Sequence, residues 1–158
     1  MQSQIEAGRL NRAARSAVAC ERATGVPAEL TIAQWAVESG WGAHQPGNNC
    51  FGIKAYSGCY GIQLLKTSEF INGSLQMMQR EFATFPTLTA CFEKHAELIC
   101  KGMPYRRAWQ EFETSKSITA LVQSIAPIYA TAPNYAETLL GVISMPAIVE
   151  ALTEARRG

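Results

Sequence analysis

The sequence predicts a mostly helical α+β protein with about six or seven helices and one β-hairpin. Apolar residues recur at helical spacing over most of the chain, an Asn-Gly pair divides the one segment that lacks this spacing, and Gly or Pro stands at the expected helix boundaries. With 158 residues, of which 47% are hydrophobic and 17% charged, the chain suits one compact domain over 1–158.

The N-terminal part of the chain predicts two helices and a long loop. Apolar residues at helical spacing indicate a first helix that ends near Gly25, because glycine adopts the left-handed cap readily. Pro27 suits the first turn of a second helix over residues 27–39, which Gly40 closes. Residues 43–59 are rich in Gly, Asn and Pro and predict a loop of functional length.

A hairpin is expected between Tyr60 and Phe85, where the helical spacing is lost. Asn72-Gly73 divides two runs of apolar residues, and both residues tolerate the positive φ that a tight hairpin turn requires. This pair is the strongest short-range hairpin signal in the sequence.

Helical spacing returns after the hairpin and continues to the C-terminus. Gly102 ends a first stripe, Ser117 can cap a later helix that Pro127 ends, Pro133 opens another, and Pro146 separates a last amphipathic piece over residues 144–158. The apolar positions that mark these helices are Leu88, Phe92, Ala96, Ile99, Tyr105, Ala108, Trp109, Phe112, Ile118, Leu121, Val122, Ile125, Leu139, Val142, Ile143, Ile148, Val149 and Leu152, and Leu139, Val142 and Ile143 are expected to face inward.

Charge and hydropathy narrow the range of partners. The net charge of +1 gives no basic surplus, so no nucleic acid is expected as a partner. No run of about 18 apolar residues occurs, so no membrane span is expected. The N-terminus lacks the apolar region and cleavage site of a signal peptide, which leaves the export route of the protein unknown.

The chain has five cysteines and two histidines, and their spacing determines which disulfides and metal sites are possible. Cys91 and Cys100 belong to one predicted helix and lie about 13 Å apart, too far for a disulfide. Cys50 and Cys59 flank a short loop and could pair, but buried free thiols are the favoured interpretation. No metal-ligand spacing occurs, so neither a metal nor another cofactor is expected. Cys50 beside His44 leaves a cysteine amidase as a minor alternative.

Glu38 is the best candidate for a catalytic acid. It falls in the last turn of the predicted helix over 27–39, where the helix dipole disfavours a negative charge. Packing beside Trp35 or Trp41 would add desolvation, and both effects would raise the pKa of the carboxyl. A protonated carboxyl is what a general acid needs to protonate a glycosidic oxygen. The alternative is a solvent-exposed glutamate before a helix stop.

Four ordered segments resemble the glucosaminidase family, glycoside hydrolase family 73. The first is LTIAQWAVESGWGAHQPGNNCFGIKA, at residues 30–55. The resemblance continues through residues 66–74, 80–99 and 129–139, and it spans roughly residues 10–143 in the order and spacing of the family.

This resemblance implies a lysozyme-like fold in which a helical lobe and a small β-hairpin lobe enclose a glycan groove. It implies cleavage of the β-1,4 bond between N-acetylglucosamine and N-acetylmuramic acid in peptidoglycan glycan strands, with Glu38 as general acid. Glu69 matches a second acidic residue on the family's hairpin, although it could instead pair with a lysine such as Lys66. The alternatives are a muramidase or lytic transglycosylase of the same fold, and an inactive wall-binding module.

The resemblance also places a tyrosine beside the scissile bond. Tyr129 and Tyr135 both lie in the segment at residues 129–139 that resembles the family, and Tyr135 is favoured because a hydroxyl in the first turn of a helix is held firmly. Ala132 replaces the aspartate of the family and removes an expected helix N-cap. Both tyrosines could instead be core aromatics.

Further residues are expected to bind the glycan. By resemblance, Asn49, Phe51 and Lys54 line the groove below the acid. Trp41 and Trp109 could stack on sugar rings, with core packing as the alternative for each. The expected protein is a monomer that acts in the periplasm or cell wall as a phage lysin, a secreted effector or an autolysin fragment. An immunity protein or export machinery stays open as a partner.

Overall fold

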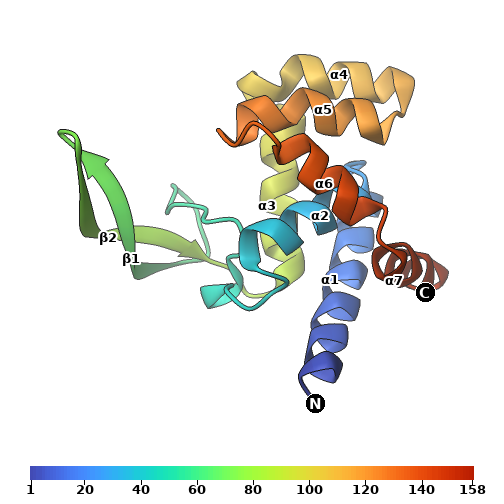
Figure 1. Cartoon of the computed structure of the whole chain (residues 1–158), viewed down its shortest axis with the longest axis horizontal. Coiled ribbons are helices and arrows are strands. Elements are labelled where there is room, and N and C mark those ends of the chain that lie inside the picture. Colours follow the sequence, from blue (N-terminus) through green and yellow to red (C-terminus); the bar gives the residue numbers. More distant parts are fainter.

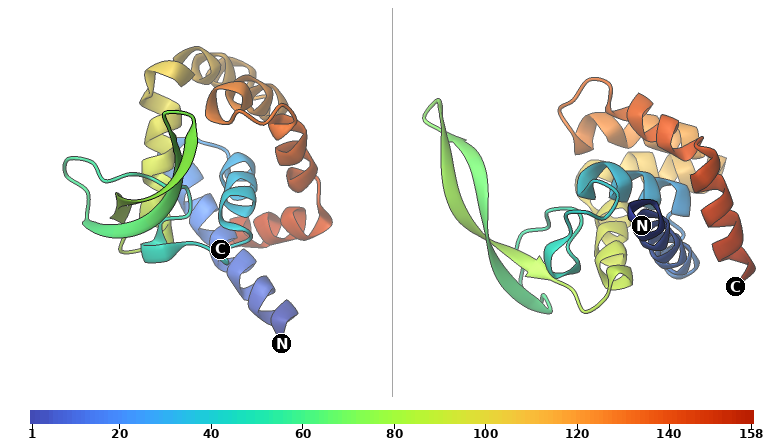
Figure 2. Two further views of the ribbon diagram at one scale, coloured as in Figure 1. Left: turned by 60° about the vertical axis from the view of Figure 1, so that its left-hand side comes forward. Right: turned by 60° about the horizontal axis from the view of Figure 1, so that its bottom comes forward.

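The computed structural model describes residues 1–158 and contains seven α-helices and one two-stranded antiparallel hairpin (Figure 1). The helices form one lobe, and the hairpin extends away from that lobe on one side (Figure 2). The fold is therefore the expected α+β arrangement of a helical lobe and a small hairpin lobe. The elements are α1 (Gln2–Thr24), α2 (Ala28–Ser39), β1 (Gly61–Ile71), β2 (Ser74–Thr84), α3 (Leu88–Lys101), α4 (Arg106–Ser115), α5 (Ile118–Tyr129), α6 (Tyr135–Ile143) and α7 (Pro146–Arg157).

Most helix boundaries follow the sequence signals. Gly25 caps α1 in the left-handed conformation, with φ 86°, and Gly40 caps α2 in the same way. The hydroxyl of Ser117 accepts a hydrogen bond from the N–H of Ala120 and caps α5. Pro27 is the N-cap of α2 rather than part of its first turn.

Two boundaries set by proline were wrong. Helix α5 continues past Pro127 to Tyr129, because a proline in the last turn removes only one helical hydrogen bond. The N–H of Ala130 still bonds to the carbonyl of Ala126 and closes this turn. Helix α6 begins at Tyr135, so Pro133 lies before the helix rather than at its first position.

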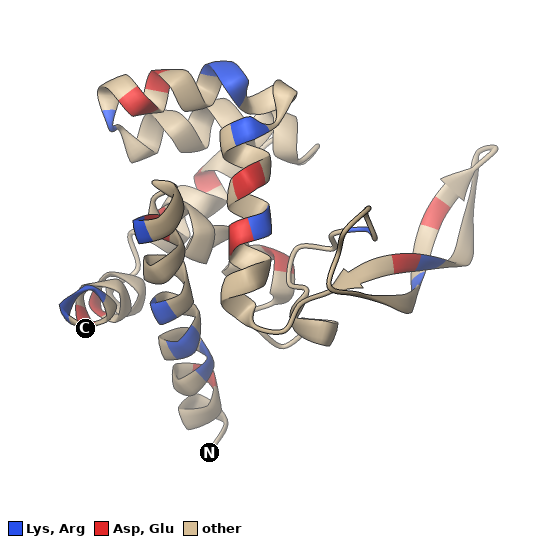
Figure 3. Cartoon of the chain, turned by 180° about the vertical axis from the view of Figure 1, so that it is seen from behind, with Lys and Arg blue, Asp and Glu red and all other residues tan.

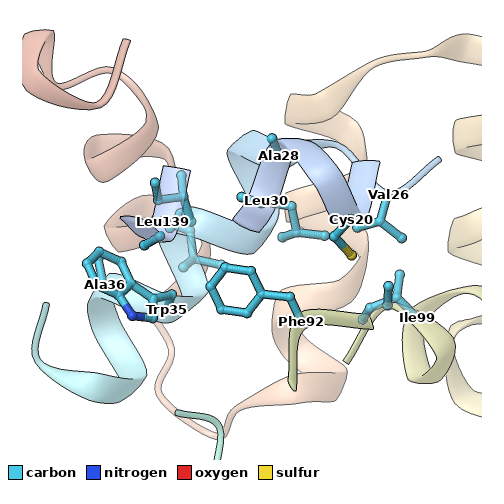
Figure 4. Packing of buried hydrophobic residues seen from close by; sticks show 14 of the residues in the cluster. Cys20, Val26, Ala28, Leu30, Trp35, Ala36, Phe92, Ile99 and Leu139 are labelled. Atoms are coloured by element: carbon cyan, nitrogen blue, oxygen red, sulfur yellow. The ribbon is translucent and has the colours of Figure 1, made fainter. Parts of the chain in front are cut away.

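Helix α2 lies at the centre of the helical lobe. Nine of its twelve residues are buried, and it packs against α1 and α6 with further contacts to α5 and α7. Phe92 of α3 lies between Trp35 and Ile99 in the core (Figure 4). All three side chains are fully buried, and truncating such a residue to alanine typically costs about 2–5 kcal/mol.

The hairpin has the register that its turn predicts. Asn72 and Gly73 both have positive φ, 51° and 81°, and the strands pair from Ile71 with Ser74 outward to Gly61 with Thr84. The segment 53–55 adds backbone hydrogen bonds along β2, which tie the base of the hairpin to the loop that follows α2. The hairpin is therefore anchored at its base, while its tip extends into solvent (Figure 2).

No single helix combines the length and apolar character needed to span a membrane. Helices α6 and α7 meet the criterion only when taken together, by length and composition, across a 60° bend.

All five cysteines are free thiols, which agrees with the favoured interpretation of the sequence. Cys50 does not pair with Cys59. Its sulfur lies 3.7 Å from the sulfur of Cys91, and both of these residues are buried. Cys100 lies on α3 with Cys91, as expected.

We predict that the five thiols react in an order set by burial. Cys59 is partly exposed and should react first with an aromatic disulfide reagent. Burial raises the pKa of Cys20 to about 11 and also raises the pKa of Cys50, so these thiols should react only after unfolding. Peptide mass mapping of the native and the denatured protein measures the order. Rapid modification of Cys20 or Cys50 in the folded protein would contradict the packing described above.

Candidate active site

Glu38 lies at a cleft of about 660 Å³ in the helical lobe. The cleft is bounded by the last turn of α2, by Phe51–Ile53 of the following loop, by α3, and by the end of α5 with residues 130–131. Helix α2 positions Glu38 there because Ser39 and residues 30–36 are buried, while Val37 and Glu38 remain exposed.

A chain of hydrogen bonds holds the Glu38 carboxyl. The hydroxyl of Tyr135 donates to Oε1 of Glu38 at 2.9 Å, and Nε2 of Gln34 donates to the Tyr135 hydroxyl oxygen at 3.2 Å. Gln34 and Glu38 are four residues apart, so they lie on the same face of α2. Burial raises the pKa of Tyr135, which keeps its hydroxyl protonated and able to donate to the carboxyl.

The turn after Glu38 depends on glycine at positions 40 and 42. Gly40, Trp41 and Gly42 have φ values of 57°, 57° and 83°, all in the left-handed region. A Cβ atom at position 42 would lie 2.9 Å from Cζ2 of Trp35, closer than real Cβ contacts allow. The sequence ESGWG therefore folds the chain sharply back over Trp35 directly after the carboxyl.

Neither of the two tryptophans expected at sugar rings lines the cleft with Glu38. Trp41 is half-buried and packs edge-on against Trp35, with 6.2 Å between ring centroids. Trp109 is half-buried against Phe112, at 5.3 Å between centroids, and lies beside Gly25. Both tryptophans thus have the core-packing positions that the sequence left open as the alternative.

Tyr129 lies beside Tyr135, so both tyrosines indicated by the family resemblance are near Glu38. Their rings stack with 5.9 Å between centroids and an interplanar angle of 4°, and Tyr129 lines the cleft. Only Tyr135 bonds to the carboxyl. The N-cap expectation at position 132 was wrong, because Asn134 precedes the helix and Ala132 contributes only a carbonyl that accepts from the N–H of Tyr135.

Asn49 and Phe51 have different surroundings. The buried Asn49 amide donates to the carbonyls of Ile53 and Ala83, at 2.8 and 2.9 Å, and its oxygen accepts from the N–H of Ile53 at 3.1 Å. The Asn49 amide thus forms hydrogen bonds with the backbone that joins the loop to β2. Asn49 does not line the cleft. Phe51 does line the cleft and stacks on His95, with 4.2 Å between centroids.

Glu69 lies on the hairpin in an ion-pair cluster rather than on the wall of the Glu38 cleft. Nη2 of Arg80 lies 2.8 Å from its Oε2, and Nζ of Lys54 lies 3.8 Å from its Oε1. Acidic and basic residues both lie along the hairpin (Figure 3). The strand register puts Arg80 on the same face as Glu69, so Arg80 takes the place of Lys66, the alternative partner that the sequence suggested. The hydrogen bonds from Arg80 lower the pKa of Glu69, so this group is ionised at neutral pH.

Two residues of the cleft region escaped the sequence analysis. Gln34 could have been found as a long polar side chain one helical turn before Glu38, among the apolar residues Ile32, Ala33 and Trp35. His95 interrupts the apolar stripe of α3, which includes Phe92, Ala96 and Ile99, and it lines the cleft beside Glu38. A polar side chain on a buried face is the signal in both cases.

The helical lobe, the hairpin and the carboxyl at the cleft define a lysozyme-like glycoside hydrolase domain. The glucosaminidase family model, described as mannosyl-glycoprotein endo-beta-N-acetylglucosaminidase, matches residues 14–146. The chain belongs to this family, as its sequence motifs indicated.

Curated relatives include the peptidoglycan hydrolase FlgJ of Salmonella typhimurium, 30% identical over 128 residues, which cover 76% of this chain. A probable N-acetylmuramidase of Lactococcus lactis subsp. lactis is 30% identical over 141 residues, which cover 83% of this chain. The chain spans only 40% and 31% of the length of these two relatives.

Solved structures share the fold over nearly the whole chain. A peptidoglycan hydrolase mutant from Sphingomonas sp. A1 superposes with a TM-score of 0.72 at 27% identity, covering 94% of this chain and 99% of that one. A C-terminally truncated glycoside hydrolase domain of Salmonella typhimurium FlgJ gives a TM-score of 0.70 at 26% identity, with coverage of 87% and 95%. The expected lysozyme-like class is thus confirmed.

We predict that Arg80→Gln raises the pKa of Glu69 toward its ordinary value. The ion pair stabilises the fold above the ordinary carboxyl pKa, and this contribution is lost as the pH falls through the lowered pKa of the folded state. Side-chain carboxyl shifts followed by NMR across an acid titration measure the change. Arg107→Gln, which removes the partner of Glu111 on α4, is the matched control. An unchanged Glu69 midpoint in Arg80→Gln would exclude the pairing in solution.

Proposed function

We propose that this chain is a peptidoglycan hydrolase that cleaves the β-1,4 bond between N-acetylglucosamine and N-acetylmuramic acid. The observation that carries the proposal is the Glu38 carboxyl, exposed at a cleft and held by the buried Tyr135 hydroxyl. Membership of the glucosaminidase family and the likeness to peptidoglycan hydrolase structures support the substrate class. The expected place of action is the periplasm or cell wall.

Glu38 acts in this proposal as the general acid. The Tyr135 hydroxyl bonds to Oε1, which leaves Oε2 free to carry the proton toward the glycosidic oxygen. Gln34 fixes the orientation of the Tyr135 hydroxyl, so the carboxyl is held from the buried side before substrate arrives. A carboxyl held in one position protonates the leaving oxygen without first having to reorient.

Glu69 is the second carboxylate of the proposal. Because Arg80 lowers its pKa, the Glu69 carboxylate is ionised and could activate a water molecule or stabilise the positive charge that develops on the sugar ring. It lies on the hairpin and does not line the Glu38 cleft, so the hairpin would have to close over bound glycan. Attack by the N-acetyl group of the substrate is the alternative route, and it would make Glu69 less important than Glu38.

Phe51 and Tyr129 are the proposed sugar contacts, because their rings line the cleft beside Glu38. Lys54 is proposed to steady Glu69 when glycan binds, since it lies within ion-pair distance of that carboxylate.

A muramidase or lytic transglycosylase is the second candidate, because one relative is named a probable N-acetylmuramidase. Mass spectrometry of digested peptidoglycan separates the candidates. The proposed bond preference yields reducing N-acetylglucosamine ends, a muramidase yields reducing muramic acid ends, and a transglycosylase yields 1,6-anhydro muramic ends. Absence of any product would indicate an inactive wall-binding module.

Glu38→Gln is expected to keep the fold and to lower peptidoglycan cleavage by about two to four orders of magnitude, since an amide cannot supply the proton. Release of soluble fragments from purified peptidoglycan measures the rate, and circular dichroism checks the fold. Glu150→Gln, an exposed glutamate on α7, is the matched control and should retain full activity. A folded Glu38→Gln protein with near-wild-type turnover would remove Glu38 from the mechanism.

Glu69→Gln should slow cleavage less than Glu38→Gln does, because water or the N-acetyl group can still attack. The same fragment-release assay compares the two variants. In a crystal structure of the free protein, we expect the two carboxyls to lie farther apart than the roughly 5–5.5 Å of enzymes that use a carboxylate nucleophile. An unchanged rate in Glu69→Gln would exclude a role for this residue.

A further inference from the structure

His95 is a buried histidine that lines the same cleft as Glu38. Its side chain comes from α3 and is only 1% exposed. The ring stacks on Phe51 at 4.2 Å between centroids and 25° between planes, and it meets Tyr129 at 5.8 Å and 64°. Two aromatic rings thus hold the imidazole in one orientation at the cleft wall.

Neither nitrogen of this ring has a hydrogen-bond partner within the protein. Buried polar atoms form hydrogen bonds in the large majority of cases. An unpaired one loses its hydrogen bonds with water and gains none within the protein, which destabilises the folded state. A phenylalanine at position 95 would stack on Phe51 equally well without this loss. The polarity of the ring is therefore unexplained by packing alone.

The chemistry of the ring defines the class of group that it can bind. Burial lowers the pKa of His95 to about 4, so the ring is neutral at physiological pH. A neutral imidazole carries one N–H donor and one acceptor nitrogen. It suits an uncharged group such as an amide, and it offers no positive charge to attract a carboxylate or phosphate.

We infer that His95 is a specificity-determining residue that hydrogen-bonds an acetamido group of the glycan in the Glu38 cleft. This inference rests on the proposed function, since that function supplies an N-acetylated substrate. An acetamido group presents both a carbonyl and an N–H, and either one satisfies a nitrogen of the ring. Both ring nitrogens are shielded from solvent in the free protein, so the Phe51 side chain that stacks on the ring shifts aside to admit the acetamido group.

Binding without turnover tests the inference. In the Glu38→Gln background, N-acetylated chitin oligosaccharides are titrated against the protein with and without His95→Phe. We expect His95→Phe to weaken binding by about tenfold, the effect of losing one well-placed hydrogen bond. Oligosaccharides of glucosamine, which lack the acetyl groups, should bind both proteins equally.

Stability and rescue separate a binding role from a structural one. His95→Phe should melt at or above the temperature of the parent protein, because it removes unpaired polar atoms from a buried site. His95→Gln, which keeps a donor and an acceptor, should recover part of the binding. Glu93→Gln, an exposed position on α3 outside the cleft, is the control and should change neither binding nor melting.

Unchanged affinity for chitin oligosaccharides in both His95 variants would overturn the inference. So would a His95→Phe protein that melts well below its parent, because that result would reveal an internal partner for the imidazole. Cleavage of peptidoglycan by the wild-type chain is a separate readout. Its failure would overturn the proposed function, whereas failure of the His95 variants alone would leave that function standing.

Discussion

The burial of helix α2 is the constraint on which the rest of the structure depends. Helices α1 and α6 pack against it, and only the end of the helix leaves a polar side chain free at the cleft. Because Ser39 is buried and Gly42 packs on Trp35, the chain must turn sharply directly after Glu38. The position of the carboxyl thus follows from the packing of the core rather than from a flexible loop.

Tyr135 extends this constraint across the helical lobe. It is far from α2 in sequence, but the contact between α2 and α6 brings its hydroxyl to Glu38 and to the buried Gln34. The proposed acid is therefore held by a second helix, in a network in which the tyrosine both donates and accepts. Glu69 contrasts with this arrangement, because its partners Arg80 and Lys54 lie on the hairpin and at its base. One carboxyl is fixed in the helical lobe, and the other is carried by the hairpin, which is the element with fewer buried contacts.

Local signals in the sequence predicted the fold well where local chemistry decides it. Gly25, Gly40 and the Asn72-Gly73 turn mark real boundaries because positive φ is a property of the residue and its neighbours. The signal from Pro127 failed, since a proline near the end of a helix can be tolerated when packing favours another turn. The position of Glu38 in the last turn of its helix could likewise be read from local signals alone.

The partners of the site residues could not be predicted from the sequence. Arg80 lies eleven positions from Glu69, and their contact depends on strand register and side-chain reach. The sequence predicted Asn49 in the groove, but its amide donates hydrogen bonds to the backbone carbonyls of Ile53 and Ala83. Only the three-dimensional structure shows these bonds. The approach of Cys50 to Cys91 is also a contact between distant segments. Pattern and spacing identify candidate residues, whereas tertiary packing decides what each one touches.

Glu38 is proposed to deliver a proton to the leaving oxygen, and the dependence of the cleavage rate on the leaving group shows whether it does. Wild type and Glu38→Gln would be compared on a chitin oligosaccharide and on its dinitrophenyl glycoside, whose leaving group departs without protonation. We expect Glu38→Gln to lose about two to four orders of magnitude in rate on the oligosaccharide and far less on the dinitrophenyl glycoside. Equal losses on both substrates would contradict the role of Glu38 as general acid.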